Sequence, residues 1–332
     1  SSAEVTTLKL LFRVCLVLLA LPSVSAADFP QADISNSRVR AKLYLPDAQN
    51  GYYRGTRFDW SGVIASLECD GHSYFGKWFE KYDPKLHDAI SGPVEEFFTN
   101  GAGLGYDEAK PGESFVKIGV GVLRKPDEPR YSSFNSYEIL NSGTRNLKKG
   151  KDWIEFTHEL KDSTGYAYTY RKTLRLPKDK AELVLEHSLK NTGKKAIATH
   201  AYNHNFFMLD DQPSGPDFVV KFPFDPRATA DLKGFAEVRG KELVYLQELP
   251  KGQSVFTNLE GHGTTAQDYD IRVENRKTGA GVRQTGDRPL SKVVFWSIRS
   301  NVSAEPYIEM KVEPGKEETW RIRYEFYNLP TK

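Results

Sequence analysis

Short segments rich in β-branched and aromatic residues follow one another along most of this sequence, and turn residues separate them. No long helical period occurs between residues 27 and 332. No repeat of fixed length and no linker-like stretch divides the series. The pattern predicts an all-β fold, a large antiparallel sandwich, in which residues 27–332 form a single domain. We expect strands at residues 39–45, 52–60, 63–69, 74–75, 115–123, 153–160, 166–176, 183–189, 199–209, 218–222, 243–246, 269–273, 293–298, 307–312 and 319–326.

The segment from residue 83 to residue 107 is less regular than its neighbours. Gly92 and Pro93, together with three glycines between residues 101 and 105, mark a long loop. Glu95 and Glu96 lie inside it beside aromatic residues. Long loops in compact domains often carry function, so we expect this one near a binding cleft. An ordinary solvated pair of glutamates is the alternative.

Charge and cysteine content exclude several classes of function. The 332 residues carry a formal net charge of +2, and the basic residues are scattered, so no nucleic-acid footprint is present. Aromatic residues make up 12% of the chain, which suits β-structure and also grooves that stack sugar rings. Cys15 and Cys69 are the only cysteines in the sequence, and no zinc-type ligand spacing occurs outside residues 199–209. We therefore expect no internal disulfide and no structural metal.

The first residues have the pattern of an export signal. Lys9 and Arg13 precede an apolar run at residues 14–21, and residues 24–26 (Val-Ser-Ala) provide small side chains for cleavage. The run is short for a membrane span, although an uncleaved N-terminal anchor is the alternative. We predict a signal peptide at residues 1–26 and an exported protein, periplasmic or extracellular, with no stable membrane insertion after cleavage.

Residues 199–209 concentrate histidine, asparagine and aromatic side chains. His200 and His204 are separated by an even number of residues, so on a strand they face the same side. Imidazole is the side chain most readily poised for proton transfer near neutral pH. This stretch is therefore the first candidate for a functional site.

Four motifs support a more specific hypothesis. Residues 189–193 read Leu-Lys-Asn-Thr-Gly, residues 203–207 Asn-His-Asn-Phe-Phe, residues 304–306 Ala-Glu-Pro, and residues 312–315 Val-Glu-Pro-Gly. Their order resembles the galactose mutarotase-like (aldose 1-epimerase) superfamily, and the resemblance spans most of the chain after residue 27. It implies a large antiparallel β-supersandwich with a sugar-binding cleft on its concave face.

The resemblance also implies an acid and a base. Anomers interconvert when the C1 hydroxyl loses its proton while the ring oxygen gains one. The acid of the superfamily falls on His204 and the base on Glu305. Partial burial would raise the basicity of that carboxylate. A pyranose held between the two groups would need a separation of roughly 5–8 Å. The chemistry is proton transfer alone, so no cofactor is expected.

Two features of the well-characterised galactose enzymes are missing, namely their Asn-Arg-Ile arginine and their Leu-His-Gly-Gly histidine. Arg57 is the best candidate to donate hydrogen bonds to sugar hydroxyls. Glu96 is a candidate hydroxyl acceptor, and His200 a candidate wall of the pocket. Tyr202 and Trp296 complete the candidate substrate-binding set as sugar platforms.

Most of these candidates also have an interpretation in which they support the fold and play no part in function. His204 and the two aromatic candidates fit a buried core. Glu305 fits an exposed loop, and Arg57 could form a surface pair with Asp59 or Glu68.

Three functions remain open at this point. The first is an exported aldose 1-epimerase-like isomerase acting on a free sugar or a sugar-chain end. The second is a non-catalytic carbohydrate-binding protein on the same fold. The third is a glycan-cleaving hydrolase, with Glu95 or Glu96 paired to Glu305, or a lyase. A saccharide is the expected partner in all three, and the sequence leaves the oligomeric state open.

Overall fold

The computed structural model describes residues 29–330, which form β-strands and two short 3-10 turns without any α-helix. The strands assemble into four sheets, and neighbouring strands run antiparallel. This confirms the predicted all-β fold class. Nothing in this range is a helix long and apolar enough to cross a membrane. The predicted signal peptide, residues 1–26, lies outside the described residues.

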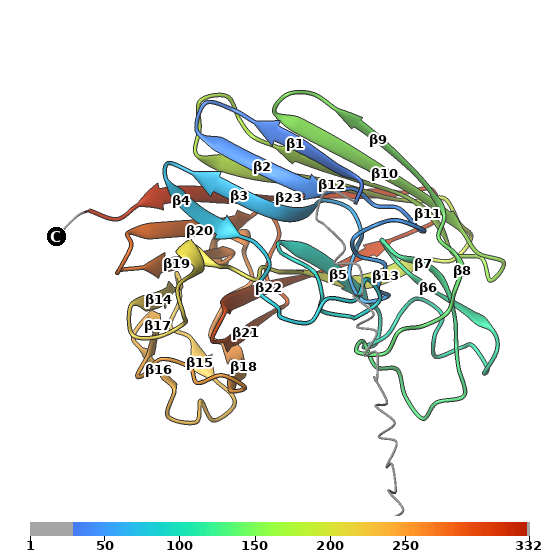
Figure 1. Cartoon of the computed structure of the whole chain (residues 1–332). Helices are drawn as coiled ribbons and strands as arrows, with labels where there is room; N and C mark the ends of the chain where they lie inside the picture. The colour runs from blue at the N-terminus through green and yellow to red at the C-terminus, as the bar shows by residue number, and fades with distance from the viewer. Residues whose placement is uncertain (1–28, 331–332) are drawn as a thin grey trace, which may run out of the picture.

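A ten-stranded sheet forms the largest layer (Figure 1). On its strand β23 the side chains alternate, so that Trp320, Ile322, Tyr324 and Phe326 are buried while Arg321, Arg323 and Glu325 point the other way. One face of the sheet is therefore apolar and must be covered. In spatial order the strands are β16 (Ala236–Arg239), β17 (Glu242–Tyr245), β14 (Phe218–Lys221), β19 (Asp270–Asn275), β20 (Ala280–Gly286), β23 (Glu317–Asn328), β12 (Glu182–Asn191), β11 (Ala167–Arg175), β10 (Trp153–Lys161) and β9 (Thr144–Lys149).

A six-stranded sheet covers part of that apolar face. The Phe97 ring lies 5.3 Å from Tyr170 of β11, and the Tyr245 hydroxyl of β17 donates to Ser297 Oγ at 2.7 Å. These contacts fix the two sheets face to face, which is the arrangement of a sandwich. In spatial order the strands are β15 (Arg227–Ala228), β18 (Ser254–Glu260), β21 (Lys292–Ile298), β22 (Asn301–Val312), β13 (Ile197–His204) and β5 (Val94–Phe98).

A four-stranded sheet covers another part of the same face. It runs in chain order through β1 (Gln31–Ser35), β2 (Val39–Tyr44), β3 (Val63–Cys69) and β4 (His72–Phe75). The Tyr74 ring of β4 packs 4.5 Å from Phe326, and Phe75 lies 6.2 Å from Tyr324. A smaller sheet comprises β6 (Ser114–Lys117), β7 (Gly121–Arg124) and β8 (Ile139–Asn141), and the 3-10 turns are η2 (Leu209–Asp211) and η3 (Ala266–Asp268).

Four expected segments differ from the structure. The predicted strand 199–209 ends at His204, the last residue of β13. Residues 52–60, predicted as a strand, form irregular backbone that is anchored where Asp59 N donates to Glu95 O at 2.8 Å. The predicted strand 115–123 is two strands, because the chain turns at Gly119, whose φ of +82° a side chain rarely permits. The predicted loop 83–107 contains strand β5, so Glu95 and Glu96 stand on opposite faces of a sheet.

Candidate functional site

The register of β13 and β22 brings His204 and Glu305 together. Tyr202 of β13 lies opposite Tyr307 of β22 in an antiparallel pair. His204 lies two residues beyond Tyr202 and Glu305 two residues before Tyr307, so both point to the same face at the same level. His204 Nε2 is 3.2 Å from Glu305 Oε1. Two residues about a hundred positions apart in sequence thus form one buried pair.

Burial sets the protonation of this pair. The two side chains are only 7% and 5% exposed. Desolvation raises the pKa of Glu305 to about 8, and desolvation also lowers the pKa of His204 well below its usual value, with Arg57 and His87 adding to the effect. At neutral pH the proton is therefore on Glu305, the imidazole is neutral, and the pair carries no net charge. A pair in this state can act as acid and base together once the proton moves to the imidazole.

Neighbouring groups hold the imidazole in place. His204 Nδ1 lies 3.1 Å from Ser303 Oγ, which itself accepts a hydrogen bond from Asn205 N at 3.0 Å. The Phe206 ring stacks on the imidazole at 3.6 Å, with 9° between the planes. Phe206 has a φ of +45°, a left-handed value that is unusual for an aromatic residue. Just after the end of β13 the backbone is therefore strained at Phe206. This conformation places the phenyl ring against the imidazole of His204, the proposed acid.

Arg57 belongs to the same site through Glu96. Arg57 Nε lies 3.0 Å from Glu96 Oε2, and Arg57 Nη2 donates to the Tyr202 hydroxyl at 3.1 Å. The Tyr202 hydroxyl in turn donates to Glu96 Oε2 at 2.6 Å, and Lys117 Nζ donates to Glu96 Oε1 at 3.1 Å. Arg57 thus pairs with Glu96, and the structure records no ion pair with Asp59 or Glu68. The guanidinium is held in one orientation beside the pair.

Glu96 is ionised in this arrangement. Its burial alone would raise its pKa, but Lys117 and Arg57 outweigh that effect and lower the pKa to about 2. Both carboxylate oxygens already accept hydrogen bonds from the protein. Glu96 therefore acts first as the anchor of Arg57 and Lys117, and its capacity to accept a sugar hydroxyl is correspondingly smaller.

Two residues at the edge of the site carried no sequence signal. His87 Nδ1 lies 3.3 Å from Arg57 Nη1, and the Phe134 ring lies 4.5 Å from the His87 ring. Phe134 is 65% exposed, although it is a large apolar side chain. The Arg57 guanidinium also lies 5.5 Å from the Phe134 ring. Lys117 was missed as well, because a lysine in an alternating strand reads as a solvent-facing residue.

Aromatic side chains line the pair on its other sides. Trp296 of β21 is half-buried with its ring 5.2 Å from His204. The Tyr202 and Tyr307 rings stack at 4.2 Å, and the Tyr307 hydroxyl donates to Glu305 Oε2 at 3.5 Å. Tyr202 and Trp296 thus lie beside His204, and their role as sugar platforms stays a prediction.

His200 and Glu95 lie elsewhere. His200 stacks on Phe98 at 5.3 Å and lines a separate hollow of about 390 Å³, whose lining does not include His204 or Glu305. Glu95 points to the opposite face of β5, where it accepts from Lys172, lies 2.6 Å from His187 and accepts from Asn203 at 3.1 Å. Glu95 therefore cannot pair with Glu305 to cleave a glycosidic bond.

Among residues 29–330, no group of three or more His, Cys, Asp or Glu side chains is arranged to hold a metal ion. The His204–Glu305 pair can transfer protons, and Arg57 is a fixed cation near it. Cys69 is a free, buried cysteine on β3.

Comparisons with known proteins address the fold. No protein-family model matches the sequence, and no curated protein matches it. Solved structures do match over nearly the whole chain. The galactose mutarotase related enzyme from Lactobacillus acidophilus has 13% identity and a TM-score of 0.55, covering 91% of this chain and 99% of that one. A galactose mutarotase-like protein from Clostridium acetobutylicum has 12% identity and a TM-score of 0.57, covering 92% and 98%.

A third similar structure is the GalM/aldose epimerase homologue from C. elegans, with 13% identity, a TM-score of 0.55 and coverage of 91% and 99%. The shared architecture extends from end to end of these proteins, although few residues are identical. The chain therefore has the galactose mutarotase-like fold.

Proposed function

We propose that the protein is an aldose 1-epimerase-like isomerase that interconverts the anomers of a sugar. The observation that carries the proposal is the buried contact of 3.2 Å between His204 Nε2 and Glu305 Oε1. The pair holds one proton, because burial raises the pKa of Glu305 to about 8 and lowers that of His204. Acid and base of one reaction then lie side by side.

The contact is shorter than the 5–8 Å expected for a sugar between the two groups. The two oxygens that react are both bonded to the anomeric carbon, so they are close neighbours. A sugar that presents its C1 edge to the pair can therefore meet both groups from one side. The substrate would lie against the pair instead of between its members.

The proposed reaction consists of proton transfers that need no cofactor. The proton on Glu305 first crosses to His204. The Glu305 carboxylate then takes the C1 hydroxyl proton while the C1–O5 bond breaks and His204 protonates the ring oxygen, which yields the open-chain aldehyde. Rotation about the C1–C2 bond then presents the other face of the aldehyde to the C5 oxygen. The reverse proton transfers close the ring as the other anomer and return the pair to its starting protonation. Arg57, held by Glu96, is positioned to hydrogen-bond a sugar hydroxyl.

Polarimetry tests this function. Freshly dissolved α-anomers of glucose, galactose, mannose, xylose and arabinose should mutarotate faster with the protein than without it. Buffer catalysis and heat-denatured protein serve as the controls. If no aldose in a broad panel is accelerated, the isomerase assignment is wrong.

Non-catalytic saccharide binding is the second candidate. The burial of His204 and Glu305, whose side chains are only 7% and 5% exposed, favours it, because buried groups are less accessible to a substrate. This candidate requires sugar binding without any acceleration of mutarotation. Calorimetric titration of the same sugars, together with polarimetry, distinguishes the two functions.

A further inference from the structure

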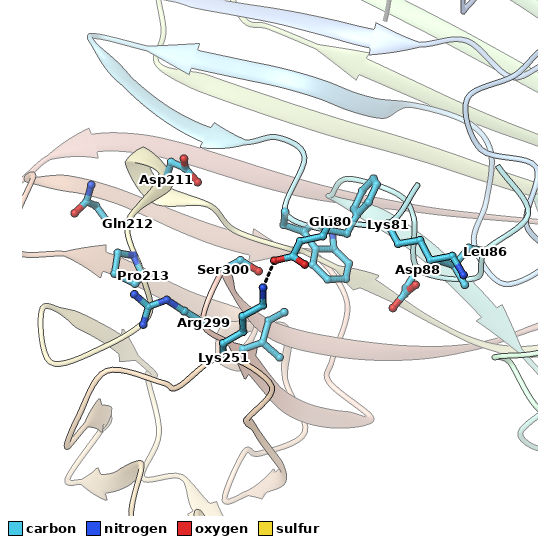
Figure 2. A pocket seen from close by; sticks show the side chains of 13 residues that line it. Glu80, Lys81, Leu86, Asp88, Asp211, Gln212, Pro213, Lys251, Arg299 and Ser300 are labelled. Carbon is cyan, nitrogen blue, oxygen red and sulfur yellow. Dashed lines mark ion pairs between the residues drawn. The ribbon is translucent and has the colours of Figure 1, made fainter. Parts of the chain in front are cut away.

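A pocket of about 640 Å³ lies beside the candidate site, and its side chains are shown in Figure 2. The volume is in the range of pockets that bind organic ligands. Trp78, Phe79, Leu86 and Ile298 supply its apolar surface. We call it the Trp78 pocket. It contains none of the residues assigned above to proton transfer.

Trp78 and Asp88 connect the pocket to the site. The Trp78 ring stacks on Phe206 at 4.8 Å, and Phe206 stacks on His204. At the other edge, Asp88 Oδ1 lies 3.7 Å from His87 Nε2, and His87 contacts Arg57. A ligand stacked on Trp78 would therefore be separated from His204 by two rings, those of Trp78 and Phe206.

Charge in the pocket favours a neutral ligand. Three acidic side chains, Glu80, Asp88 and Asp211, are balanced by three basic ones, Lys81, Lys251 and Arg299. Lys251 Nζ pairs with Glu80 Oε1 at 2.6 Å, as the dashed line in Figure 2 shows. A phosphate or a uronic acid would meet carboxylates as often as cations. Mixed polar groups of both signs suit hydroxyl groups, which donate and accept.

The polar groups of the pocket include several without a protein partner. The side chains of Asp211, Lys81 and Ser300 make no hydrogen bond or ion pair with another residue in the described range 29–330. Asp210 and Asp211 both have left-handed backbone, with φ of +56° and +53°. His72 Nδ1 and Ser73 N hold the Asp210 carboxylate at 2.8 and 2.9 Å. This strained turn brings the backbone of Asp211 to the pocket, which the residue lines.

Trp78 itself offers an apolar platform. Its Nε1 donates to Ile90 O at 2.8 Å, so the polar part of the indole is already satisfied within the protein. Only the apolar surface of the Trp78 indole ring is therefore left to contact a ligand. A ring surface next to unpaired hydroxyl, carboxylate and ammonium groups matches a sugar unit, which has an apolar face and a polar rim.

We propose that the Trp78 pocket binds the outer units of a neutral oligosaccharide whose reducing end lies at the His204–Glu305 pair. The inference rests on the proposed function for the position of the reducing end. It specifies the substrate class as a sugar-chain end instead of a free monosaccharide. Asp211 and Ser300 would hydrogen-bond hydroxyl groups of the outer units, and Trp78 would stack on one ring.

Binding of borohydride-reduced oligosaccharides tests the inference separately from catalysis. Reduction removes the anomeric centre, so these probes bind without being substrates. Malto-, cello-, manno- and galacto-oligosaccharides of one to five units would be titrated by calorimetry. In at least one series the affinity should rise about tenfold between one and three units, as expected for one stacked and hydrogen-bonded sugar ring.

Two variants of pocket residues and one matched control test whether the outer sugar units bind in the Trp78 pocket. Asp211→Gly removes the carboxylate and tolerates the left-handed backbone, and Trp78→Leu removes the platform. Both should abolish the dependence of affinity on chain length. Asp179→Gly is the control, because Asp179 is a remote aspartate with a similar φ of +57°. Thermal unfolding would show that each variant is folded.

The outcomes separate the two proposals. Equal affinity for one and five units in every series overturns the pocket assignment, and so does a chain-length effect that survives both variants. A chain-length effect that both variants abolish supports it. If mutarotation is absent while this effect persists, the isomerase proposal fails and the saccharide-binding pocket stands.

Discussion

At the scale of single residues, the unusual feature is a buried contact of 3.2 Å between a histidine, His204, and a glutamate, Glu305. An isolated carboxylate is ionised and an isolated imidazole half-charged near neutral pH. Burial shifts both pKa values toward the uncharged forms, to about 8 for Glu305 and well below its usual value for His204. The pair therefore keeps one proton over a broad range of pH.

The pH dependence of kcat/KM should follow the single proton of this pair. Above about pH 8 the pair loses it, no acid remains for the ring oxygen, and the rate should fall. At acid pH a second proton arrives on the imidazole and blocks the base, so the rate should fall again well below pH 6.5. Polarimetry from pH 4 to 10 measures the profile. A rate that keeps rising through pH 9 would show that the base acts alone.

At the scale of elements, β5 supports the site through both of its faces. One face carries Glu96, which anchors Arg57 and Lys117. The other face carries Glu95, which joins Lys172 of β11 and His187 of β12 across the sandwich. Burial alone would raise the pKa of Glu95, but Lys172 and His187 lower it to about 2. The strand therefore ties the site to the ten-stranded sheet by ionic contacts.

Removing one partner of the Glu95 cluster should be costly. Lys172→Met leaves a buried carboxylate short of its cation, and the free energy of unfolding should fall by about 3–5 kcal/mol. Glu95→Gln added to Lys172→Met should restore part of the loss. Lys311→Met, which breaks an exposed pair with Glu313, should change stability by less than about 1 kcal/mol.

Urea unfolding followed by tryptophan fluorescence measures these differences. If Lys172→Met were as stable as Lys311→Met, the cluster would not tie the sheets together.

Periodicity in the sequence predicted most strands, because alternation of side chains is a local property. The same reasoning missed β5, since Pro93 and the nearby glycines gave its surroundings the composition of a loop. Residues 52–60 were mistaken for a strand because Tyr53, Phe58 and Trp60 are residue types that strands favour. Their rings instead fill a buried aromatic cluster beside the site. The composition of a segment shows that its side chains are hydrophobic, but it does not show which residues they pack against.

The site was predictable only in part for a similar reason. His204 and Glu305 carry a motif each, and the order of these motifs along the chain was enough to connect the two residues. Lys117, His87 and Phe134 have no such signature, and only folding brings them to Arg57. Asn191 and Asn205, also in the motifs, have structural roles. Asn191 Nδ2 donates to Val312 O, and Asn205 Nδ2 donates to Ala304 O.

At the scale of the whole molecule, two smaller sheets cover one face of the ten-stranded sheet (Figure 1). The candidate site draws Arg57 from the connection between β2 and β3 and the acid–base pair from the six-stranded sheet. Strand residues backed by a packed sheet hold a site more rigidly than loop residues. We infer that the scaffold is rigid at His204 and Glu305, and under the proposed function we expect the loops around Phe134 and Trp78 to select the sugar.

Export is a separate prediction about the whole chain. Expressed behind an initiator methionine in a Gram-negative bacterium, the sequence should yield a periplasmic protein whose N-terminus is Ala27. Cell fractionation and N-terminal sequencing measure this. The variant Val17→Arg/Leu18→Arg interrupts the apolar run and should stay in the cytoplasm. Recovery of uncleaved wild-type chain in the cytoplasm would refute a signal peptide at residues 1–26.

The central claim is that Glu305 exchanges a proton with a sugar. It is tested most directly by the mutarotation rate of Glu305→Gln beside that of Glu309→Gln, with the best aldose found. Glu309 is an exposed carboxylate four residues along the same face of β22. Glu305→Gln should lose at least about a hundredfold in kcat/KM, the usual contribution of a general base, while Glu309→Gln keeps the wild-type rate. A folded Glu305→Gln protein with the wild-type rate would contradict the account.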